Sequence, residues 1–288
     1  MSEISANAWY NGAIRPSGEV GPSIASISFH IGTGVFDGLM AYFNRDHYYL
    51  HRAEEHLDRL RSGASYMNLR FPWSTADFLN GINQLLDLEP RMTYYIRPIV
   101  FRAEPELTIT GADRKEADVC IFGVRVQRDL DVPLTCCISD VERASANAMP
   151  THCKVSGVYV NSYLVRSRAE MQGYSDGLML DRHGRIAEAS AANVFFIHKG
   201  GLVTPEITPE ILAGVTRFVV MEIAKELGIT VSERAVWPGE LDQFDGVFLC
   251  STLLELRPVD FIGDRRLGTS ANDVFLRIVA SFRKITHQ

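Results

Sequence analysis

Apolar residues recur along this chain with two periods, and each period predicts a different kind of element. Spacings of three and four residues predict helices at 48–67, 74–89, 155–173, 211–228 and 273–285. Alternation and short apolar runs predict strands at 23–29, 92–102, 117–126, 134–141 and 246–251, with three short strands between 177 and 204. Asn11-Gly12 follows another such run and predicts a two-residue hairpin turn. The pattern therefore predicts an α+β or mixed α/β fold.

Length and composition indicate a globular protein. The chain has 288 residues, of which 46% are hydrophobic and 22% charged, and this length is sufficient for two modest domains or one large one. A short polar segment at 126–132 separates strands with two helices from a second series of strands. We therefore predict a small N-terminal domain at 1–125, a linker at 126–132 and a larger domain at 133–288.

Charge and cysteine content exclude several classes of protein. The net charge is −6 and no basic stripe occurs, which disfavours nucleic-acid binding. No run of 18 apolar residues predicts a membrane span, and the N-terminus does not resemble a secretory signal. The cysteines are odd in number and lack a C-x-x-C pair, which favours reduced thiols and a cytoplasmic location.

A single lysine, Lys154, lies in the stretch "MPTHCKVSGVYVNS" (149–162), where no other charged side chain occurs from 144 to 165. Such a lysine has two interpretations. It can extend along apolar surface and keep its ammonium in water. Alternatively, it is a partly desolvated amine that acts as a nucleophile and forms a Schiff base.

Other candidate residues each have a structural and a functional interpretation. Glu188 lies among small residues, either facing solvent or buried with a partner. Tyr95 and Arg97 share one strand face, where they bind a carboxylate or form a surface pair. A helix begins at Gly214-Val215-Thr216 and is either an anion site or an ordinary helix start.

The charges near the first predicted helix have structural alternatives as well. Arg59 is either functional or a solvated helix charge paired with Glu55. Three histidines (His47, His51 and His56) lack the further ligands of a zinc set, so we predict no metal site. Glycines 32, 34 and 38 do not match the dinucleotide-binding pattern, and we expect them to permit close backbone approach.

Taken in order, several of these motifs resemble the fold-type IV pyridoxal-phosphate enzymes, and most closely the branched-chain aminotransferases. The similar segments are "GTGVFDG", "YYIRP", "MPTHCKVSGVYVNSYLV", "GLMLDRHGRIAEASAANVF" and "LAGVTR". The resemblance extends from about Trp9 to about Pro258. It implies a two-domain fold with a barrel-like β core in the larger domain, pyridoxal 5'-phosphate as cofactor, and a homodimer whose active sites are completed by the neighbouring subunit.

The resemblance also implies a role for each matching residue. Lys154 would hold the cofactor as an internal aldimine and move a proton between the substrate Cα and the cofactor. Glu188 would pair with the pyridine nitrogen and Tyr159 with the phenolic oxygen. The remaining cofactor contacts, all to the phosphate, would come from Arg59, Val215, Thr216 and Thr252. The substrate side would be lined by Phe36, Gly38, Tyr95, Arg97 and Leu253.

Departures from the family pattern leave the substrate open. Leu253 and Leu254 replace small residues in a turn whose backbone N–H groups grip the substrate carboxylate in the family. Ile31 and Met40 replace a usual tyrosine and arginine. We predict an aminotransferase that acts on a branched-chain or other hydrophobic amino acid and a 2-oxo acid such as 2-oxoglutarate. The alternatives are a lyase similar to 4-amino-4-deoxychorismate lyase, a D-amino-acid or amine transaminase, and a non-catalytic relative.

Overall fold

The computed structural model describes residues 3–109, 116–127 and 132–286, which form two compact units. The first unit comprises residues up to 127 together with 153–157, and the second comprises 128–152 and 158–287. The segment around Lys154 therefore packs with the first unit, although its position in the chain lies within the second. Residues 128–131 of the predicted linker lie outside the described residues.

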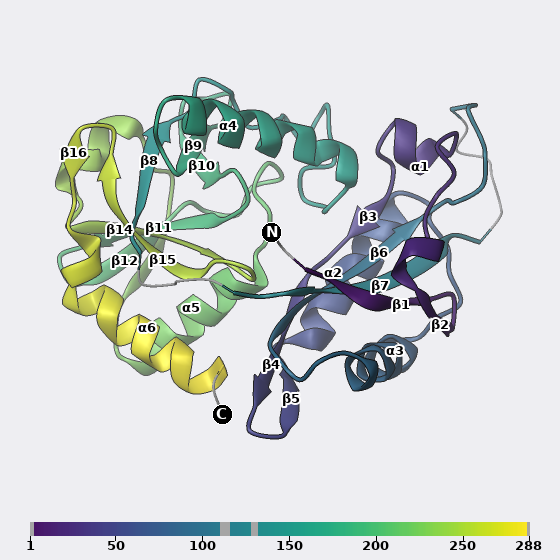
Figure 1. The fold of residues 1–288 in the computed structure, drawn as a ribbon. Helices are drawn as coiled ribbons and strands as arrows, with labels where there is room; N and C mark the ends of the chain where they lie inside the picture. Colours follow the sequence, from purple (N-terminus) through teal and green to yellow (C-terminus); the bar gives the residue numbers. More distant parts are fainter. Residues whose placement is uncertain (1–2, 110–115, 128–131, 287–288) are drawn as a thin grey trace. The chain divides into compact units, whose positions relative to one another are not determined.

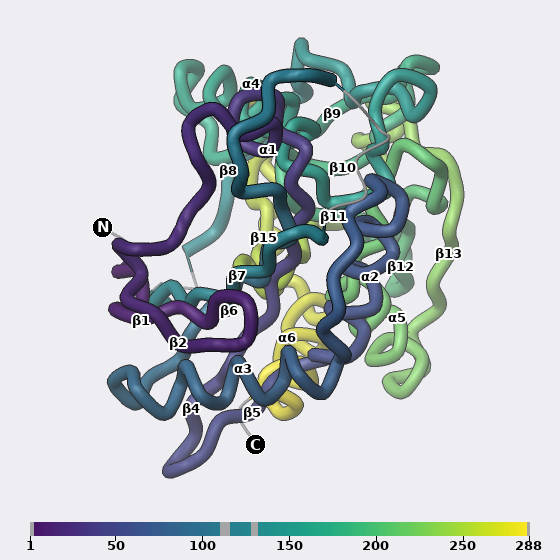
Figure 2. Tube along the Cα trace, turned by 90° about the vertical axis from the view of Figure 1, so that its right-hand side faces the viewer, coloured from purple at the N-terminus to yellow at the C-terminus, as the bar shows by residue number. Residues whose placement is uncertain are grey.

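A seven-stranded sheet forms the centre of the first unit. Its strands are β1 (Ile4–Tyr10), β2 (Ala13–Pro16), β3 (Val35–Phe36), β4 (Leu39–Asn44), β5 (His47–Leu50), β6 (Tyr94–Phe101) and β7 (Asp118–Arg125). The order is β2-β1-β7-β6-β4-β5, with β3 also paired to β6. The β4–β5 hairpin extends beyond the other strands of this unit (Figure 2). All the pairings are antiparallel.

Most short-range signals in this unit are confirmed, with two exceptions. Asn11 and Gly12 both have positive φ in the β1–β2 turn, as a type I′ hairpin requires. Helix α3 (Thr75–Leu88) begins with the expected capping box of Ser74 and Asp77. The helix predicted at 48–67 begins later, as α2 (Ala53–Tyr66), because its first three residues pair with β4 as part of strand β5.

The strand predicted at 23–29 is wrong. This segment contains a short helix instead, α1 (Ile27–His30), because the Ser26 side chain accepts a hydrogen bond from the Phe29 N–H and caps the helix. The alternating pattern does not reflect a half-buried strand, since Ile24 and Phe29 are exposed while Ser26 is buried.

The second unit is built on a nine-stranded mixed sheet in the order β10-β9-β8-β15-β14-β11-β12-β13, with β16 paired to β15. Its strands are β8 (Leu134–Ile138), β9 (Asp176–Leu180), β10 (Ile186–Ala189), β11 (Asn193–His198), β12 (Gly201–Thr204), β13 (Val231–Glu233), β14 (Gly246–Ser251), β15 (Glu255–Ile262) and β16 (Arg265–Arg266). Four strands rather than the predicted three lie between 176 and 204. The extra one arises because the small residues at 190–192 form a turn between β10 and β11.

The sheet of the second unit curls and gives the expected barrel-like core. The strand at one edge of the sheet, β10, returns to β11 further along the same sheet. The Ala189 N–H donates to the Ala192 carbonyl at 2.8 Å where the chain passes from β10 to β11. One face encloses an apolar cluster that includes Val194, Phe196 and Val247. Helices α5 (Val215–Glu226) and α6 (Asp273–Thr286) lie together against the other face, and α4 (Tyr159–Met171) packs against β9 (Figure 1).

Candidate functional site

The residues predicted to form the site are divided between the two units. The first unit carries Phe36, Gly38, Arg59, Tyr95, Arg97 and Lys154. The second unit carries Tyr159, Glu188, Val215, Thr216, Thr252 and Leu253.

The backbone around Lys154 is held against the β3 strand of the first unit. The Phe36 N–H donates to the Lys154 carbonyl at 3.0 Å, and the Gly157 N–H donates to the Gly32 carbonyl at 2.8 Å. Gly32 has a φ of +74°, and a Cβ at this position would lie 2.8 Å from the Gly157 Cα. The glycine cluster thus permits close backbone approach, as the sequence predicts.

The Lys154 side chain is half-buried beside an aromatic ring that also contacts a second cation. Its Nζ atom lies 5.6 Å from the centroid of the Phe36 ring. The Cζ atom of Arg97 lies 4.4 Å from the same centroid, and Arg97 Nη2 donates to the Tyr95 hydroxyl at 3.3 Å. Tyr95 and Arg97 therefore lie side by side on β6, which confirms their predicted common face, and Phe36 connects them to the lysine.

Gly38 is required by the position of Tyr95. A Cβ on Gly38 would lie 1.9 Å from the Tyr95 hydroxyl oxygen, which is far inside van der Waals contact. Tyr95 itself is buried, so its ring has little room to move away.

We therefore expect Gly38→Ala to displace the Tyr95 hydroxyl from Arg97. The overpacking should cost about 1–3 kcal/mol of stability. Thermal unfolding measures this loss. Gly18→Ala is the control, because a Cβ there meets no atom within 4 Å. Equal behaviour of the two variants would contradict the expected displacement.

Arg59 belongs to a buried polar cluster rather than to the surface. Its Nε and Nη2 atoms each lie 2.8 Å from a carboxylate oxygen of Asp37, and His56 Nδ1 lies 2.8 Å from Asp37 Oδ1. The alternative of a solvated pair between Arg59 and Glu55 is wrong, since Glu55 pairs with Arg52. Sequence reasoning missed Asp37 and His56 as members of the site. A lone carboxylate in the apolar stretch "GVFDGLM" was the available signal for Asp37.

Glu188 is the buried acid that the sequence allowed as one alternative. It is 6% exposed. Its Oε1 atom lies 2.9 Å from Arg143 Nε, and Asn193 Nδ2 donates to its Oε2 atom at 3.2 Å. A cation and an amide thus compensate the buried carboxylate. Neither partner was identified from the sequence, because neither forms a local pattern with Glu188.

Arg143 connects the acid to two other segments of the second unit. Its Nε atom donates to the Glu210 carbonyl at 2.9 Å, and Nη2 donates to the Thr151 carbonyl at 3.2 Å. Thr151 lies three residues before Lys154. Asn161 of α4 accepts from the Ala144 N–H at 3.0 Å, so the helix that begins at Tyr159 is joined to the same segment.

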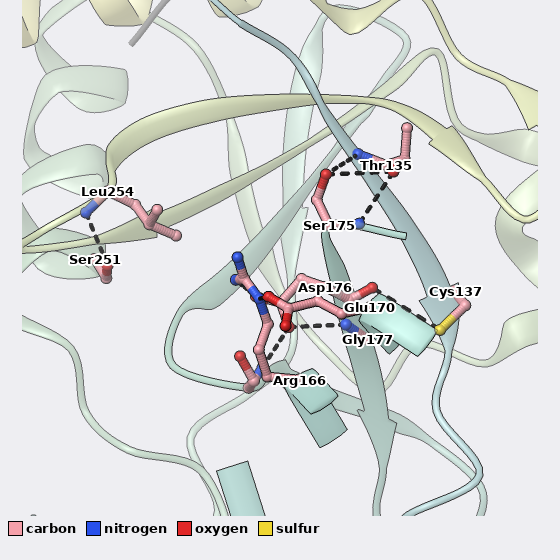
Figure 3. Close-up of polar contacts among 10 residues, drawn as sticks. Thr135, Cys137, Arg166, Glu170, Ser175, Asp176, Gly177, Ser251 and Leu254 are labelled. Carbon is pink, nitrogen blue, oxygen red and sulfur yellow. Dashed lines mark hydrogen bonds and ion pairs between the residues drawn. The ribbon is translucent and has the colours of Figure 1, made fainter. Parts of the chain in front are cut away.

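A second buried carboxylate, Asp176, holds the other end of the Glu188 strand. Its Oδ1 atom accepts from the Gly177 N–H at 2.8 Å and from the Ser190 N–H at 3.3 Å. Arg166 lies 3.3 Å from its Oδ2 atom and also pairs with Glu170 (Figure 3). These contacts join β9 to the residues that follow β10, which fixes the strand that carries Glu188.

Helix α5 begins next to the Glu188 cluster and offers backbone N–H groups to an anion. Among the described residues, no side chain caps its N-terminus at Gly214. Asn193 Nδ2 also donates to the Leu212 carbonyl at 3.0 Å, and a Cβ on Gly214 would lie 2.0 Å from Asn193 Oδ1. Asn193 therefore links the acid to the helix start, where Val215 and Thr216 form the first turn.

The turn that follows β14 separates its two leucines. The Leu254 N–H donates to the Ser251 hydroxyl at 3.2 Å (Figure 3), and the Leu254 side chain packs against the barrel core. Leu253 is 45% exposed. Of the two bulky replacements in this turn, only Leu253 thus presents its side chain outside the core, next to Thr252.

Comparisons with known proteins identify the family of this chain. A model of the family described as amino-transferase class IV matches residues 34–262. A probable branched-chain-amino-acid aminotransferase from Aquifex aeolicus is 35% identical over 91% of this chain and 86% of its own. The branched-chain aminotransferase of Thermoproteus uzoniensis, solved with norvaline, has a TM-score of 0.93 at 28% identity, covering 98% of this chain and 95% of its own. The holo form of the Thermobaculum terrenum enzyme, which contains PLP, has a TM-score of 0.91 at 28% identity over 99% and 95% of the two chains.

The chain belongs to the class IV aminotransferase family. Members of this family are pyridoxal-phosphate enzymes, so the predicted enzyme class and cofactor are confirmed. The residues described above fit that cofactor, because they supply a lysine amine, a buried carboxylate, a part-buried arginine and a helix N-terminus without a side-chain cap. No group of metal-ligating side chains occurs in the described part of the chain.

Proposed function

We propose that this aminotransferase transfers the amino group of a branched-chain or other hydrophobic amino acid to a 2-oxo acid such as 2-oxoglutarate. The observation that carries the proposal is the cluster around Phe36, where Lys154 Nζ and the Arg97 guanidinium lie near one apolar ring and Arg97 also lies over the Tyr95 ring. The two substrates of this reaction differ, since one has a hydrophobic side chain and the other has a second carboxylate. An apolar surface suits the first, and an arginine beside a tyrosine suits the second. The names of the related enzymes support the same substrate class.

The bound cofactor supplies an electron sink for the negative charge that develops at the substrate Cα. In our proposal, Lys154 Nζ holds the cofactor and moves the proton taken from that carbon. Glu188, which lies beside Arg143, pairs with the pyridine nitrogen. Tyr159 binds the phenolic oxygen.

Charged and backbone donors then bind the cofactor phosphate and the substrate carboxylates. Arg59, with the first turn of α5 at Val215 and Thr216 and with Thr252, binds the phosphate. Arg97 and Tyr95 bind a substrate carboxylate, and the backbone of the turn at Leu253 binds another. Phe36 and Gly38 line the substrate side.

A panel of amino donors tests the proposed reaction. Purified holoenzyme is mixed with L- and D-amino acids and aryl amines, and the cofactor absorbance is followed. We expect branched-chain L-amino acids to convert the cofactor to its amine form and 2-oxoglutarate to reverse the change. Conversion only by D-amino acids or amines would contradict the substrate class. Release of pyruvate from aminodeoxychorismate without this change would contradict amino transfer itself.

We also propose that the enzyme is a cytoplasmic homodimer whose active sites are completed by the neighbouring subunit. Five buried free thiols are compatible with a reducing compartment. Exposed apolar side chains at Val160, Tyr163 and Leu164 give helix α4 an apolar face, which a second subunit would cover. Light scattering of the purified protein measures the assembly, and a monomer with full activity would contradict it. No helix in the described part of the chain has the length and hydrophobicity to span a membrane.

A further inference from the structure

Asp37 is a fully buried carboxylate to which the proposed reaction assigns no role. It lies between β3 and β4, and its side chain is 0% exposed. Its Oδ2 atom accepts from Arg59 Nε at 2.8 Å, and its Oδ1 atom accepts from Arg59 Nη2 at 2.8 Å and from the Gly38 N–H at 2.7 Å. His56 Nδ1 lies 2.8 Å from the same Oδ1 atom.

The charge states of this cluster follow from its chemistry. Burial by itself raises the pKa of Asp37, but the Arg59 charge and the hydrogen bonds from Arg59 and His56 outweigh it and hold the pKa well below the usual range. Burial, together with the Arg59 and Lys154 charges, lowers the pKa of His56 despite the contact with Asp37, so the imidazole is neutral at neutral pH. A carboxylate only accepts, so the neutral ring carries its proton on Nδ1.

The contact between Asp37 and Arg59 also orients the guanidinium group. A carboxylate that engages Nε and Nη2 together fixes the plane of an arginine fork. The Nη1 edge of Arg59 is then the edge turned away from Asp37. His56 packs from the same helix turn, with its Nδ1 atom 3.3 Å from Arg59 Nη2.

Three consecutive residues thus each hold one part of the site in the first unit. Phe36 binds the Lys154 carbonyl, Asp37 binds Arg59, and Gly38 makes room for Tyr95. The position of the Arg59 guanidinium relative to Lys154 is therefore set through Asp37.

We propose that Asp37, supported by His56, is a positioning residue that orients Arg59 towards the cofactor phosphate. This inference rests on the proposed phosphate role of Arg59. A preorganised arginine loses less conformational freedom when it binds an anion than a mobile one does. The affinity for the phosphate is thereby set by a carboxylate that does not contact it.

The test compares the dissociation constants of the apoprotein for pyridoxal 5'-phosphate and for pyridoxal, which lacks the phosphate. We expect Asp37→Asn to weaken pyridoxal-phosphate binding by about 10-fold to 100-fold, the range for partners that orient metal-binding side chains. The affinity for pyridoxal should change by less than about threefold. Asp58→Asn is the matched control, because it removes one negative charge beside Arg59 on the exposed face of α2.

A second pair of variants tests the same idea without removing the buried charge. His56→Asn keeps an N–H donor close to the position of Nδ1 and should resemble the unsubstituted protein. His56→Phe removes the donor and should weaken binding of pyridoxal phosphate but not of pyridoxal. Equal effects of Asp37→Asn on both ligands, or no effect on either, would overturn the inference.

Arg59→Gln distinguishes failure of the proposed phosphate site from failure of the positioning role of Asp37. If Arg59→Gln leaves the ratio of the two dissociation constants unchanged, Arg59 does not bind the phosphate. That result overturns the role of Asp37 together with this part of the proposed site. A changed ratio in Arg59→Gln with an unchanged ratio in Asp37→Asn overturns only the positioning role.

Discussion

Lys154→Ala is expected to lower the rate of amino transfer by about 10⁴-fold or more and to remove the visible absorbance band of the bound cofactor. Two functions are lost together in our proposal, because the same amine holds the cofactor and moves the proton. General acid–base catalysis alone contributes about 10²–10⁴-fold, and loss of the covalent attachment adds to this. Single-turnover kinetics and absorbance spectra of the reconstituted protein measure the two losses.

Two further variants separate the chemistry of Lys154 from its charge. Lys154→Arg keeps a cation beside the Phe36 ring, which lies 5.6 Å from Nζ, but it lacks a nucleophilic amine. We expect it to be as inactive as the alanine variant while retaining the stability of the fold. Lys284→Ala on the exposed side of α6 is the control and should remain fully active. An unchanged visible band in Lys154→Ala would identify another lysine as the attachment site.

Glu188→Gln is expected to retain the cofactor but to lower kcat by about 10²-fold or more, the lower part of the range for a positioned acid–base group. The amide keeps nearly the same shape, yet it no longer supplies a negative charge to the pyridine nitrogen. Rapid-mixing absorbance measurements of the first half-reaction report this step directly. An unchanged rate would mean that another group protonates the ring.

The same substitution leaves the buried Arg143 cation without its anion. Breaking a buried ion pair by removing one partner costs about 3–5 kcal/mol, and we expect the lower end because the amide still hydrogen-bonds. Glu170→Gln is the matched control, since Glu170 pairs with Arg166 at 2.8 Å on the protein surface. An exposed pair contributes about 1 kcal/mol or less. Urea unfolding of the two variants compares the costs, and equal losses would contradict the importance of burial.

Interactions between neighbours in the chain were predictable from the sequence. The Asn11-Gly12 turn, the capping box at Ser74 and the start of α5 after Gly214 each depend on residues within one turn. The helical and alternating patterns also identified most elements of the fold. The prediction at 23–29 was wrong because a local serine cap decided between helix and strand.

The candidate site was predictable only in part. Lys154 and Glu188 were identifiable because an ionised group among small and apolar residues requires a physical explanation. Recognition of the motifs in order then indicated their roles. The packing of Leu254 into the barrel core was not predictable, because the sequence does not show which of two adjacent leucines turns inward.

By itself, the sequence determined the class of fold, the family and the chemical type of each principal residue. The tertiary structure decided which partners keep those residues in place. Asp37 reaches Arg59 across 22 positions of the chain, and Arg143 reaches Glu188 from a different segment of the second unit. Such contacts carry no periodic or local signal, because they form only when separate strands and helices pack and bury their polar groups together.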